Sequence, residues 1–402
     1  MVPISEFSRK HLLALLAIAV FPAAIPLSTA SAENAVTSAL KEGVASASLR
    51  YRFEAVEQQG FAKDAGASTA RTRIGYKTGN VAQFHAYLEF EDVSVVGSER
   101  FNSSANGLAQ YPLVVDVEST ELNQGFLLYQ VNDAISVKAG RQRILLDNQR
   151  FVGNVGWRQN EQTFDAVMVS DKRLPSTEIN YIYLGAVNSI KAQYIDVKGH
   201  LLNASYSGLS AGKLTGYGYL LDYDNSTADS QTLGVRFSGK QQVGDVGLLY
   251  TAEFAMQRDY ADAPSTVDAD YTLIEGGVVA AGVTVKLGYE LLGGDGTYGF
   301  ATPLATKHAF NGWADKFLVT PKEGLEDSYF SVMSKVAGVK LLGVYHLYSA
   351  DKGSSDYGSE INLLAAKKLS QHYSVGVKYA GYDADTVSVD TDKFWLWAQA
   401  AF

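Results

Sequence analysis

The chain has 402 residues, 47% of them hydrophobic, with 37 glycines, 24 tyrosines and no cysteine, and its net charge is −9. An acidic chain is a poor partner for nucleic acid, and a chain without cysteine has no disulfide to hold it together. The pattern of apolar residues repeats every second position almost everywhere, which argues against ordinary soluble helical domains.

The N-terminal residues have the features of a secretory signal peptide. Arg9 and Lys10 precede an apolar run that ends at Leu27, and small residues around Ser31 form an A-x-A cleavage site. The run is too short to cross a bilayer as a helix. We therefore predict a signal peptide over residues 1–32 and a mature domain over residues 33–402, with 32 basic and 42 acidic residues and a net charge of −10.

The mature chain predicts β-strands in close succession. In the segment "ASLRYRFEAV", Leu49, Tyr51 and Phe53 fall on one face of a strand. Arg50 and Arg52 fall on the other face. Segments near residues 70–77, 84–91 and 246–257 repeat this alternation over about nine to twelve residues, which is the length that a tilted membrane strand requires.

The connecting segments alternate between short and long. The short connections are residues 77–80, 131–134, 208–212, 241–245, 336–338 and 369–371, and the long polar ones include residues 92–119, 144–163, 258–268 and 293–326. Tight periplasmic turns and long extracellular loops are typical of outer-membrane barrels. We predict an all-β transmembrane antiparallel barrel of about 18 strands, with 16 as the alternative, and interpret residues 188–199 as a loop.

The C-terminal segment supports the same architecture. "FWLWAQAAF" places Phe394, Leu396 and Phe402 on one strand face, with phenylalanine as the last residue of the sequence. Bacterial outer-membrane barrels end in a similar strand, which the outer-membrane assembly machinery reads. We predict that Phe402 is an assembly signal. We also expect no N-terminal plug domain, because the first strand is predicted to begin near Val44.

A barrel of 16 to 18 strands is wide enough to hold an aqueous channel, so its inward polar side chains become candidate pore-lining residues. A flat register sketch places Arg50 and Arg52 level with Arg73 and Arg71. Like charges that face each other destabilise a sheet, so these four arginines need acids from other strands or an anion in transit. The inward acids of this region are Glu54, Glu89, Glu91 and Glu121.

The arginines also gather in "GRQRILLDNQRFVGNVGWRQNEQTFD", residues 140–165, which runs from the upper end of a strand into a loop. Gly140 is a candidate β-bulge. We predict that the loop folds into the lumen as a constriction. Its predicted anchors are Leu145, Phe151, Val152 and Trp157, and the side chains that it is expected to present are Arg150, Arg158, Asn148 and Gln159.

This stretch, together with "RYRFEAVEQQGFAKDA" and "FATPLATKHAFNGWADKF", resembles outer-membrane proteins of the alginate export family. The resemblance extends weakly over nearly all of the mature chain. It implies an 18-stranded barrel whose arginine-lined pore passes an acidic polysaccharide. It also implies constriction roles for Arg141, Arg143, Arg150 and Arg158. The planar guanidinium suits this work, because it binds carboxylates through two hydrogen bonds and stays charged.

Signals for other chemistry are weak. The mature histidines show no metal-ligand spacing, and we predict no catalytic residue, metal or cofactor. The expected partners are outer-membrane lipid and an anionic saccharide, with no prediction of oligomeric state. Three alternatives stay open: a general diffusion porin with wall-stabilising arginines, an enzyme barrel built on His85 or His346, and a closed adhesive or structural barrel.

Overall fold

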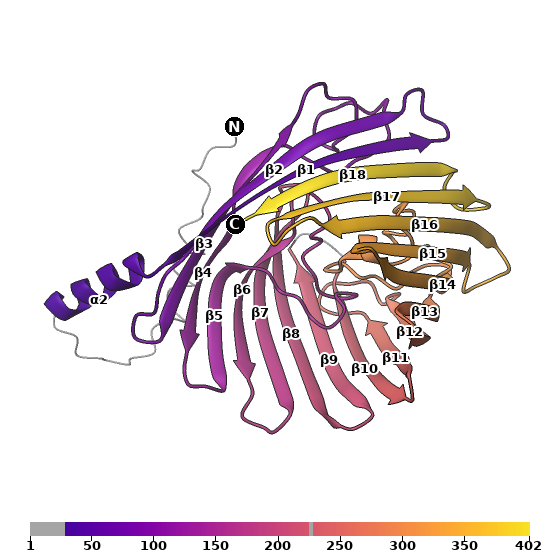
Figure 1. The fold of residues 1–402 in the computed structure, drawn as a ribbon. Helices are drawn as coiled ribbons and strands as arrows, with labels where there is room; N and C mark the ends of the chain where they lie inside the picture. Colours follow the sequence, from indigo (N-terminus) through magenta and orange to yellow (C-terminus); the bar gives the residue numbers. More distant parts are fainter. Residues whose placement is uncertain (1–28, 225–227) are drawn as a thin grey trace.

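The protein is an 18-stranded antiparallel barrel, as a computed structural model of residues 29–224 and 228–402 shows (Figure 1). The sheet closes on itself because β1 pairs with β2 on one side and with β18 on the other. This confirms the predicted all-β barrel and its strand number. The predicted signal peptide over residues 1–32 lies almost wholly outside the described residues, so its boundary stays a prediction.

The strands follow one another in chain order around the barrel. Their bounds are β1 Val44–Gln58, β2 Ala65–Lys77, β3 Phe84–Val95, β4 Ser119–Gln130, β5 Ile135–Gln142, β6 Thr163–Asp171, β7 Thr177–Asn188, β8 Tyr194–Leu209, β9 Gly212–Tyr223, β10 Ser230–Val243, β11 Val246–Arg258, β12 Asp268–Ala280, β13 Val283–Leu292, β14 Leu325–Val336, β15 Val339–Ser349, β16 Asp356–Lys368, β17 Tyr373–Ala384 and β18 Thr391–Ala401.

The connections alternate in length as the sequence predicted. At one end of the barrel the strands are joined by tight turns, such as the one between β14 and β15, and at the other end by loops of very unequal length. Two of these loops position the candidate site. We call residues 143–162, between β5 and β6, the inward loop, and residues 293–324, between β13 and β14, the long loop.

Side chains alternate between the two faces of the wall. On β1, Leu49 and Tyr51 are exposed, whereas Arg52 and Glu54 are fully buried in the barrel interior. The same pattern continues on β2, where Ile74 is exposed and Arg71 is buried. Apolar outer residues and polar inner residues are what a barrel in a lipid bilayer requires.

The final strand completes the wall. β18 pairs with β17 and β1 along its length. Beyond it, the Phe402 N–H donates to the Ala47 carbonyl O (2.9 Å), and the Phe402 carbonyl O accepts from the Ala47 N–H (3.1 Å). The Phe402 ring stacks on His372 at the neighbouring turn. Phe394, Leu396 and Phe402 are exposed on one face, as predicted. The role of Phe402 as an assembly signal stays a prediction.

Two local predictions were wrong. The predicted loop over residues 188–199 is mostly strand, since β8 begins at Tyr194 and pairs with the end of β7. The wall is extended here beside the inward loop, which supplies contacts that the sequence pattern did not reveal. At Gly140 there is no bulge, because the registers of β5 with β4 and β6 run through it unbroken. Its φ of 124° nevertheless favours glycine, and a Cβ would lie 2.3 Å from the Gly125 carbonyl O.

One helix of thirteen residues, α2 (Thr29–Lys41), lies outside the barrel beside the strand ends (Figure 1). Its last turn contacts the connection between β2 and β3, where the Gly79 N–H donates to the Ala39 carbonyl O (2.8 Å). Among the described residues, no helix is long and apolar enough to cross a membrane.

Candidate pore-lining site

The inward loop crosses the barrel interior and contacts several parts of its wall. Near its start, Asp147 accepts a hydrogen bond from Asn203 on β8 (2.7 Å). Near its end, Asn160 donates to the Val117 carbonyl O (2.7 Å) ahead of β4. Between these points, Arg50 on β1 donates to the carbonyl O of Gly156 (3.0 Å). The loop therefore lies within the lumen, as the sequence predicted for this segment.

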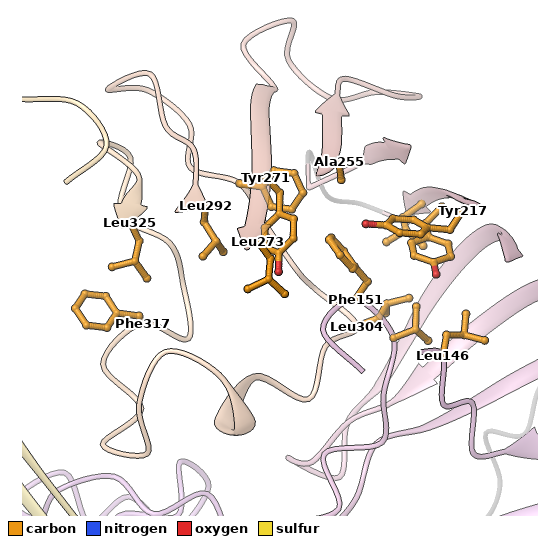
Figure 2. Close-up of a cluster of buried hydrophobic side chains, with 14 of the residues drawn as sticks. Leu146, Phe151, Tyr217, Ala255, Tyr271, Leu273, Leu292, Leu304, Phe317 and Leu325 are labelled. Atoms are coloured by element: carbon orange, nitrogen blue, oxygen red, sulfur yellow. The ribbon is translucent and has the colours of Figure 1, made fainter. Parts of the chain in front are cut away.

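An aromatic cluster anchors the first half of the inward loop. The Phe151 ring lies 5.1 Å from the ring of Tyr217 on β9 and 5.2 Å from that of Tyr271 on β12. Figure 2 shows Phe151 between these strands, with Leu146 and Leu304 beside it. Burying Phe151 in this way contributes about 2 to 3 kcal/mol to holding the loop.

The predicted anchors of the inward loop are partly corrected by the structure. Phe151 and Val152 are buried as expected, and Trp157 is partly buried against the apolar cluster. Leu145 is half exposed, and its neighbours Ile144 and Leu146 take the buried positions. Apolar character alone identified Leu145, and it did not show which of the three adjacent apolar residues faces the cluster.

The long loop packs directly against the inward loop. The Gly153 N–H donates to the Leu304 carbonyl O (2.9 Å), and the Gln162 side-chain amide donates to the same oxygen (3.0 Å). Thr306 donates its hydroxyl hydrogen to the Gln149 amide oxygen (2.9 Å). The two loops thus form one layer inside the barrel. The sequence analysis quoted residues 300–317 for their resemblance but did not predict that they fold inward.

Arg158 is held by two buried carboxylates. Its guanidinium lies 2.9 Å from Glu54 on β1 and 2.8 Å from Asp315 on the long loop. Burial favours the neutral form of Arg158, but the charges of Glu54 and Asp315 outweigh burial and raise its pKa above the usual value. Arg158 therefore joins the wall and both loops, and its charge is already matched.

Arg150 makes the corresponding contact on the opposite wall. It lies 2.7 Å from Glu290 on β13 and donates to Asn311 on the long loop (2.8 Å). Burial favours the neutral form here too, and the Glu290 charge reverses the effect, so the pKa of Arg150 is raised. Gln159 is likewise fully buried, bonded to Arg50 and Thr69. These side chains attach the loop, whereas we expected them to be presented to the lumen.

A histidine and a lysine link the two loops to β17. His308 of the long loop donates through Nδ1 to Asp315 (2.6 Å) and accepts from the Lys378 ammonium at Nε2 (2.6 Å). The ammonium also lies 4.4 Å from the ring centre of Trp157 and 3.7 Å from that of Trp313. Burial lowers the pKa of His308 to about 3, so the ring is neutral and can accept this hydrogen bond.

Arg141 differs from its predicted place in the constriction. It shares a strand face with Val137 and Ala139, and its guanidinium is bound within the wall. Nε lies 2.7 Å from Asp165 on β6, and Nη1 donates to the Leu122 carbonyl O on β4 (3.2 Å). Because β5 is short, this guanidinium fills the space between β4 and β6 where β5 has ended.

Arginines from β1 and β2 meet Arg143 below the inward loop. They border a cavity of about 440 Å³, which we call the arginine pocket, lined by Arg50, Arg71, Arg73 and Arg143 together with Glu89, Glu161 and Asn154. The register differs from the predicted one. Arg50 lies opposite Arg71, and Arg73 lies opposite Ser48. Arg52 lies higher, bound to both oxygens of Asp116 at 2.6 Å.

Four guanidiniums in the arginine pocket face three carboxylates. Arg73 pairs with Glu91 and Glu161, and Arg143 pairs with Glu89 at 2.7 Å and with Glu161. Arg50 bonds only to uncharged acceptors, those of Gln159, Gly156 and Arg158. Nε and Nη1 of Arg71 have no hydrogen-bond partner within residues 29–224 and 228–402, and the nearest carboxylate, that of Glu91, is 3.9 Å away. One buried positive charge is therefore left without a partner of its own.

The remaining predicted acids lie at the sides of this region. Glu89 accepts hydrogen bonds from Asn123 (2.8 Å) and Gln124 (3.1 Å), and Glu121 accepts one from Asn188 (2.8 Å). These contacts hold both acids in the wall. Whether any of the predicted residues lines the path of a solute stays a prediction.

A second cavity of about 470 Å³ adjoins the arginine pocket at Arg143. It is lined by Lys77, His85, Tyr87, Gln124, Phe126, Leu128, Lys138 and Met168, among others. Lys138 lies 5.1 Å from the ring centre of Phe126. The two cavities follow the inner surface of β1 to β6.

The two histidines of the predicted enzyme alternative lie apart. His85 borders the second cavity, where its Nδ1 is 3.4 Å from the Thr78 carbonyl O. His346 on β15 is buried at 2.9 Å from Asp327. Within residues 29–224 and 228–402, no group of three or more histidines and acids has the geometry to hold a metal ion.

A closed 18-stranded barrel with a polar interior and an inward loop defines an outer-membrane channel of the porin class. The chain belongs to the alginate export family, whose model matches residues 44–295, and it is a protein of the bacterial outer membrane. No curated protein matches the chain.

Solved porin structures share the fold. OccK9 (OpdG) of Pseudomonas aeruginosa is 12% identical and has a TM-score of 0.71, over 91% of this chain and 99% of that one. OpdK of Pseudomonas aeruginosa, solved with vanillate, is 15% identical with a TM-score of 0.69, over 90% and 99%. OccAB2 of Acinetobacter baumannii is 13% identical with a TM-score of 0.71, over 91% and 99%.

Proposed function

We propose that the protein is a channel for anionic solutes, with the arginine pocket as its selectivity element. The solutes of this class are anionic sugars and acidic oligosaccharides or polysaccharides of the alginate uronate type. The observation that carries the proposal is Arg71, a buried guanidinium whose Nε and Nη1 lack a hydrogen-bond partner among the described residues, directly opposite Arg50.

Electrostatics explains why an anion suits this place. Two cations that face each other across a sheet repel, and a buried charge without a partner is costly. A carboxylate that enters the pocket offsets both costs, because it accepts paired hydrogen bonds from a guanidinium. The solute thus exchanges part of its hydration for contacts that the protein has left unmade.

The comparisons support the chemical class of the solute. The family is named for the export of alginate, an acidic polysaccharide. OpdK, which shares the fold, was solved with vanillate, an aromatic carboxylate. The two substances differ in size and in their rings, and both carry a carboxylate. We therefore base the proposal on the carboxylate.

The alternative is a general diffusion porin in which arginines only stabilise the wall. Arg150 and Arg158 favour it, since each is matched by buried carboxylates and joins a loop to a strand. Arg50 has no ion pair among the described residues, and the carboxylate nearest to Arg71, that of Glu91, is 3.9 Å away and already binds Arg73. The two functions therefore assign different roles to different arginines and can be separated by substitution.

The test is the reversal potential of single channels in a salt gradient. Arg71→Gln should lower the preference for anions over cations by about tenfold, because the pocket loses its unmatched charge. The matched control is Arg258→Gln, since Arg258 lies on β11 and pairs with Asp268 at 2.9 Å. An unchanged reversal potential in Arg71→Gln would contradict the proposal and favour the general porin.

A further inference from the structure

Lysines gather at the end of the lumen that carries the tight turns. Eight lysines whose strand position faces the lumen lie within four residues of such a turn, on eight different strands, and we call them the lysine ring. Its members are Lys77, Lys138, Lys213, Lys240, Lys286, Lys335, Lys340 and Lys368. In an outer-membrane barrel the tight turns face the periplasm, so the ring surrounds the periplasmic mouth.

Strand parity directs these side chains into the lumen. Lys77 lies four residues after Arg73 on β2, and Lys240 lies four residues after Arg236 on β10. Arg236 binds the buried Glu253. Lys340 shares its face of β15 with the buried His346. Side chains separated by an even number of residues on a strand lie on the same face.

Few carboxylates match the lysine ring. Lys213 pairs with Asp147 at 3.3 Å and Lys286 with Glu275 at 2.8 Å. Lys335 and Lys340 are direct neighbours across β14 and β15, a repulsive arrangement. Among the described residues, no ion pair involves the other six lysines of the ring, which are Lys77, Lys138, Lys240, Lys335, Lys340 and Lys368.

The extracellular end of the barrel carries the opposite charge. The loops at residues 259–267 and 385–390 contain two aspartates each and no lysine or arginine. In the loop at residues 224–229, Asp224 pairs with Lys198 and Asp229 is buried. An anion therefore meets a repulsive rim on one side of the membrane and an attractive mouth on the other. Such an arrangement raises the local concentration of anions at the attractive end.

We propose that the lysine ring is a loading surface that captures polyanionic chains from the periplasm and delivers them to the arginine pocket. This inference rests on the proposed function and adds a second binding surface, at the periplasmic mouth of the channel. Lys286, Lys335, Lys340 and Lys368 occupy four adjacent strands, β13 to β16. Neighbouring strands are about 4.8 Å apart, comparable with one sugar unit, so an acidic polysaccharide meets several lysines at once.

The experiment measures how often a short oligogalacturonate blocks single channels from each side. The chain has no cysteine, so Ser354→Cys in the exposed loop between β15 and β16, labelled with an impermeant maleimide, reports the orientation of the protein in the bilayer. At about 0.1 M salt, blocking from the periplasmic side should be faster by about tenfold. The difference should vanish near 1 M salt, where screening is strong.

The variant is the triple substitution Lys335→Gln, Lys340→Gln and Lys368→Gln, and its control is Lys191→Gln in an extracellular loop. The triple variant should lose most of the periplasmic advantage, and the control should keep it. Monomeric galacturonate should show a much smaller difference between the two sides, because it contacts fewer lysines.

The outcomes separate the two proposals. Equal blocking rates from both sides, in a channel that still prefers anions, would overturn the loading surface and leave the arginine pocket intact. A channel with no preference for anions would overturn both. If the triple variant differs from the wild type only in bilayers of anionic lipid, the lysines act on lipid headgroups and the loading surface is overturned.

Discussion

Arg158 shows that the environment of an arginine, more than its presence, decides what it does. It is buried between Glu54 and Asp315, at 2.9 and 2.8 Å, and links β1 to both loops. Arg71 is also buried, and its Nε and Nη1 have no hydrogen-bond partner in the described part of the chain. The sequence alone does not distinguish the two arginines, because their partners come from strands and loops that are far apart along the chain.

Substitution of Arg158 should therefore destabilise the protein and not only change its selectivity. Arg158→Gln removes a charged hydrogen-bond donor from Glu54 and from Asp315, at a cost of about 1.5 to 3 kcal/mol. Glu54 still has Arg52 at 3.5 Å, and Asp315 still has Lys393 at 3.0 Å. We expect a lower temperature for the loss of the heat-modifiable folded form on electrophoresis. Equal stability of wild type and Arg158→Gln would show that the ion pairs are not formed.

Among the predicted constriction residues, Arg143 borders the arginine pocket and Arg141 does not. The resemblance to the family implied both, since they are two residues apart at the end of β5. Arg141 is instead bound within the wall to Asp165. The sequence could not reveal this because it depends on where β5 ends relative to its neighbours.

At the scale of elements, the inward loop was predictable and its partner was not. The sequence combined arginines with apolar anchors such as Phe151 between two strands, which indicated a folded loop. The long loop carries a similar signal in Phe300, Trp313 and Phe317, all of which contact or join the apolar cluster. Its greater length and polar flanks concealed that signal.

The contact between the two loops should depend on pH through His308. Its pKa is about 3 in the folded protein, below the ordinary value of 6.5. Between about pH 3 and pH 6.5, His308 is protonated in the unfolded chain and neutral in the folded protein. Stability is therefore lost as the pH falls, by about 1.4 kcal/mol per unit. Asp315, Lys378 and Arg158 surround the ring and contribute to its charge environment.

Tryptophan fluorescence can follow this contact between the loops, because all four tryptophans of the chain lie in it or directly beside it. Trp157 contacts Trp395 and Trp397 at 5.9 and 5.4 Å between ring centres, and Trp313 lies over Lys378. The emission should shift on acidification, with the largest change below about pH 4, as His308 becomes protonated. His308→Gln should abolish the shift and His372→Gln should not. The same profile in all three proteins would exclude His308 as the titrating group.

At the scale of the whole molecule, the alternating faces and the unequal connections were enough to predict the barrel and its strand number. The outer face shows why: Leu49 and Ile74 are exposed where lipid surrounds the wall, so the period of two is not disturbed by tertiary packing. The sequence did not predict which residues pair across neighbouring strands. Arg50 lies opposite Arg71, two residues from the predicted partner.

Phe402 belongs to the same scale, because it helps to close the wall. Its backbone exchanges hydrogen bonds of 2.9 and 3.1 Å with Ala47, and its ring stacks on His372. Phe402 also borders the arginine pocket, and deleting it should lower the yield of folded protein in the outer membrane more than it changes the conductance of the surviving channels. Phe402→Tyr, which keeps the ring, is the control. Normal yield with altered conductance would place Phe402 in the solute path.

The pairing of β1 with β18 also sets the timing of folding. Leu49 pairs with Ala400, a contact between residues at opposite ends of the barrel sequence, whereas other neighbouring strands are joined by a single connection. Until this seam forms, the sheet has two unpaired edges, which are templates for wrong association. Contacts of such long separation form slowly because a large loop must close first. β18 is the last strand to be synthesised, and its pairing with β1 removes both unpaired edges. A chaperone that shields these edges would be needed only until this pairing forms.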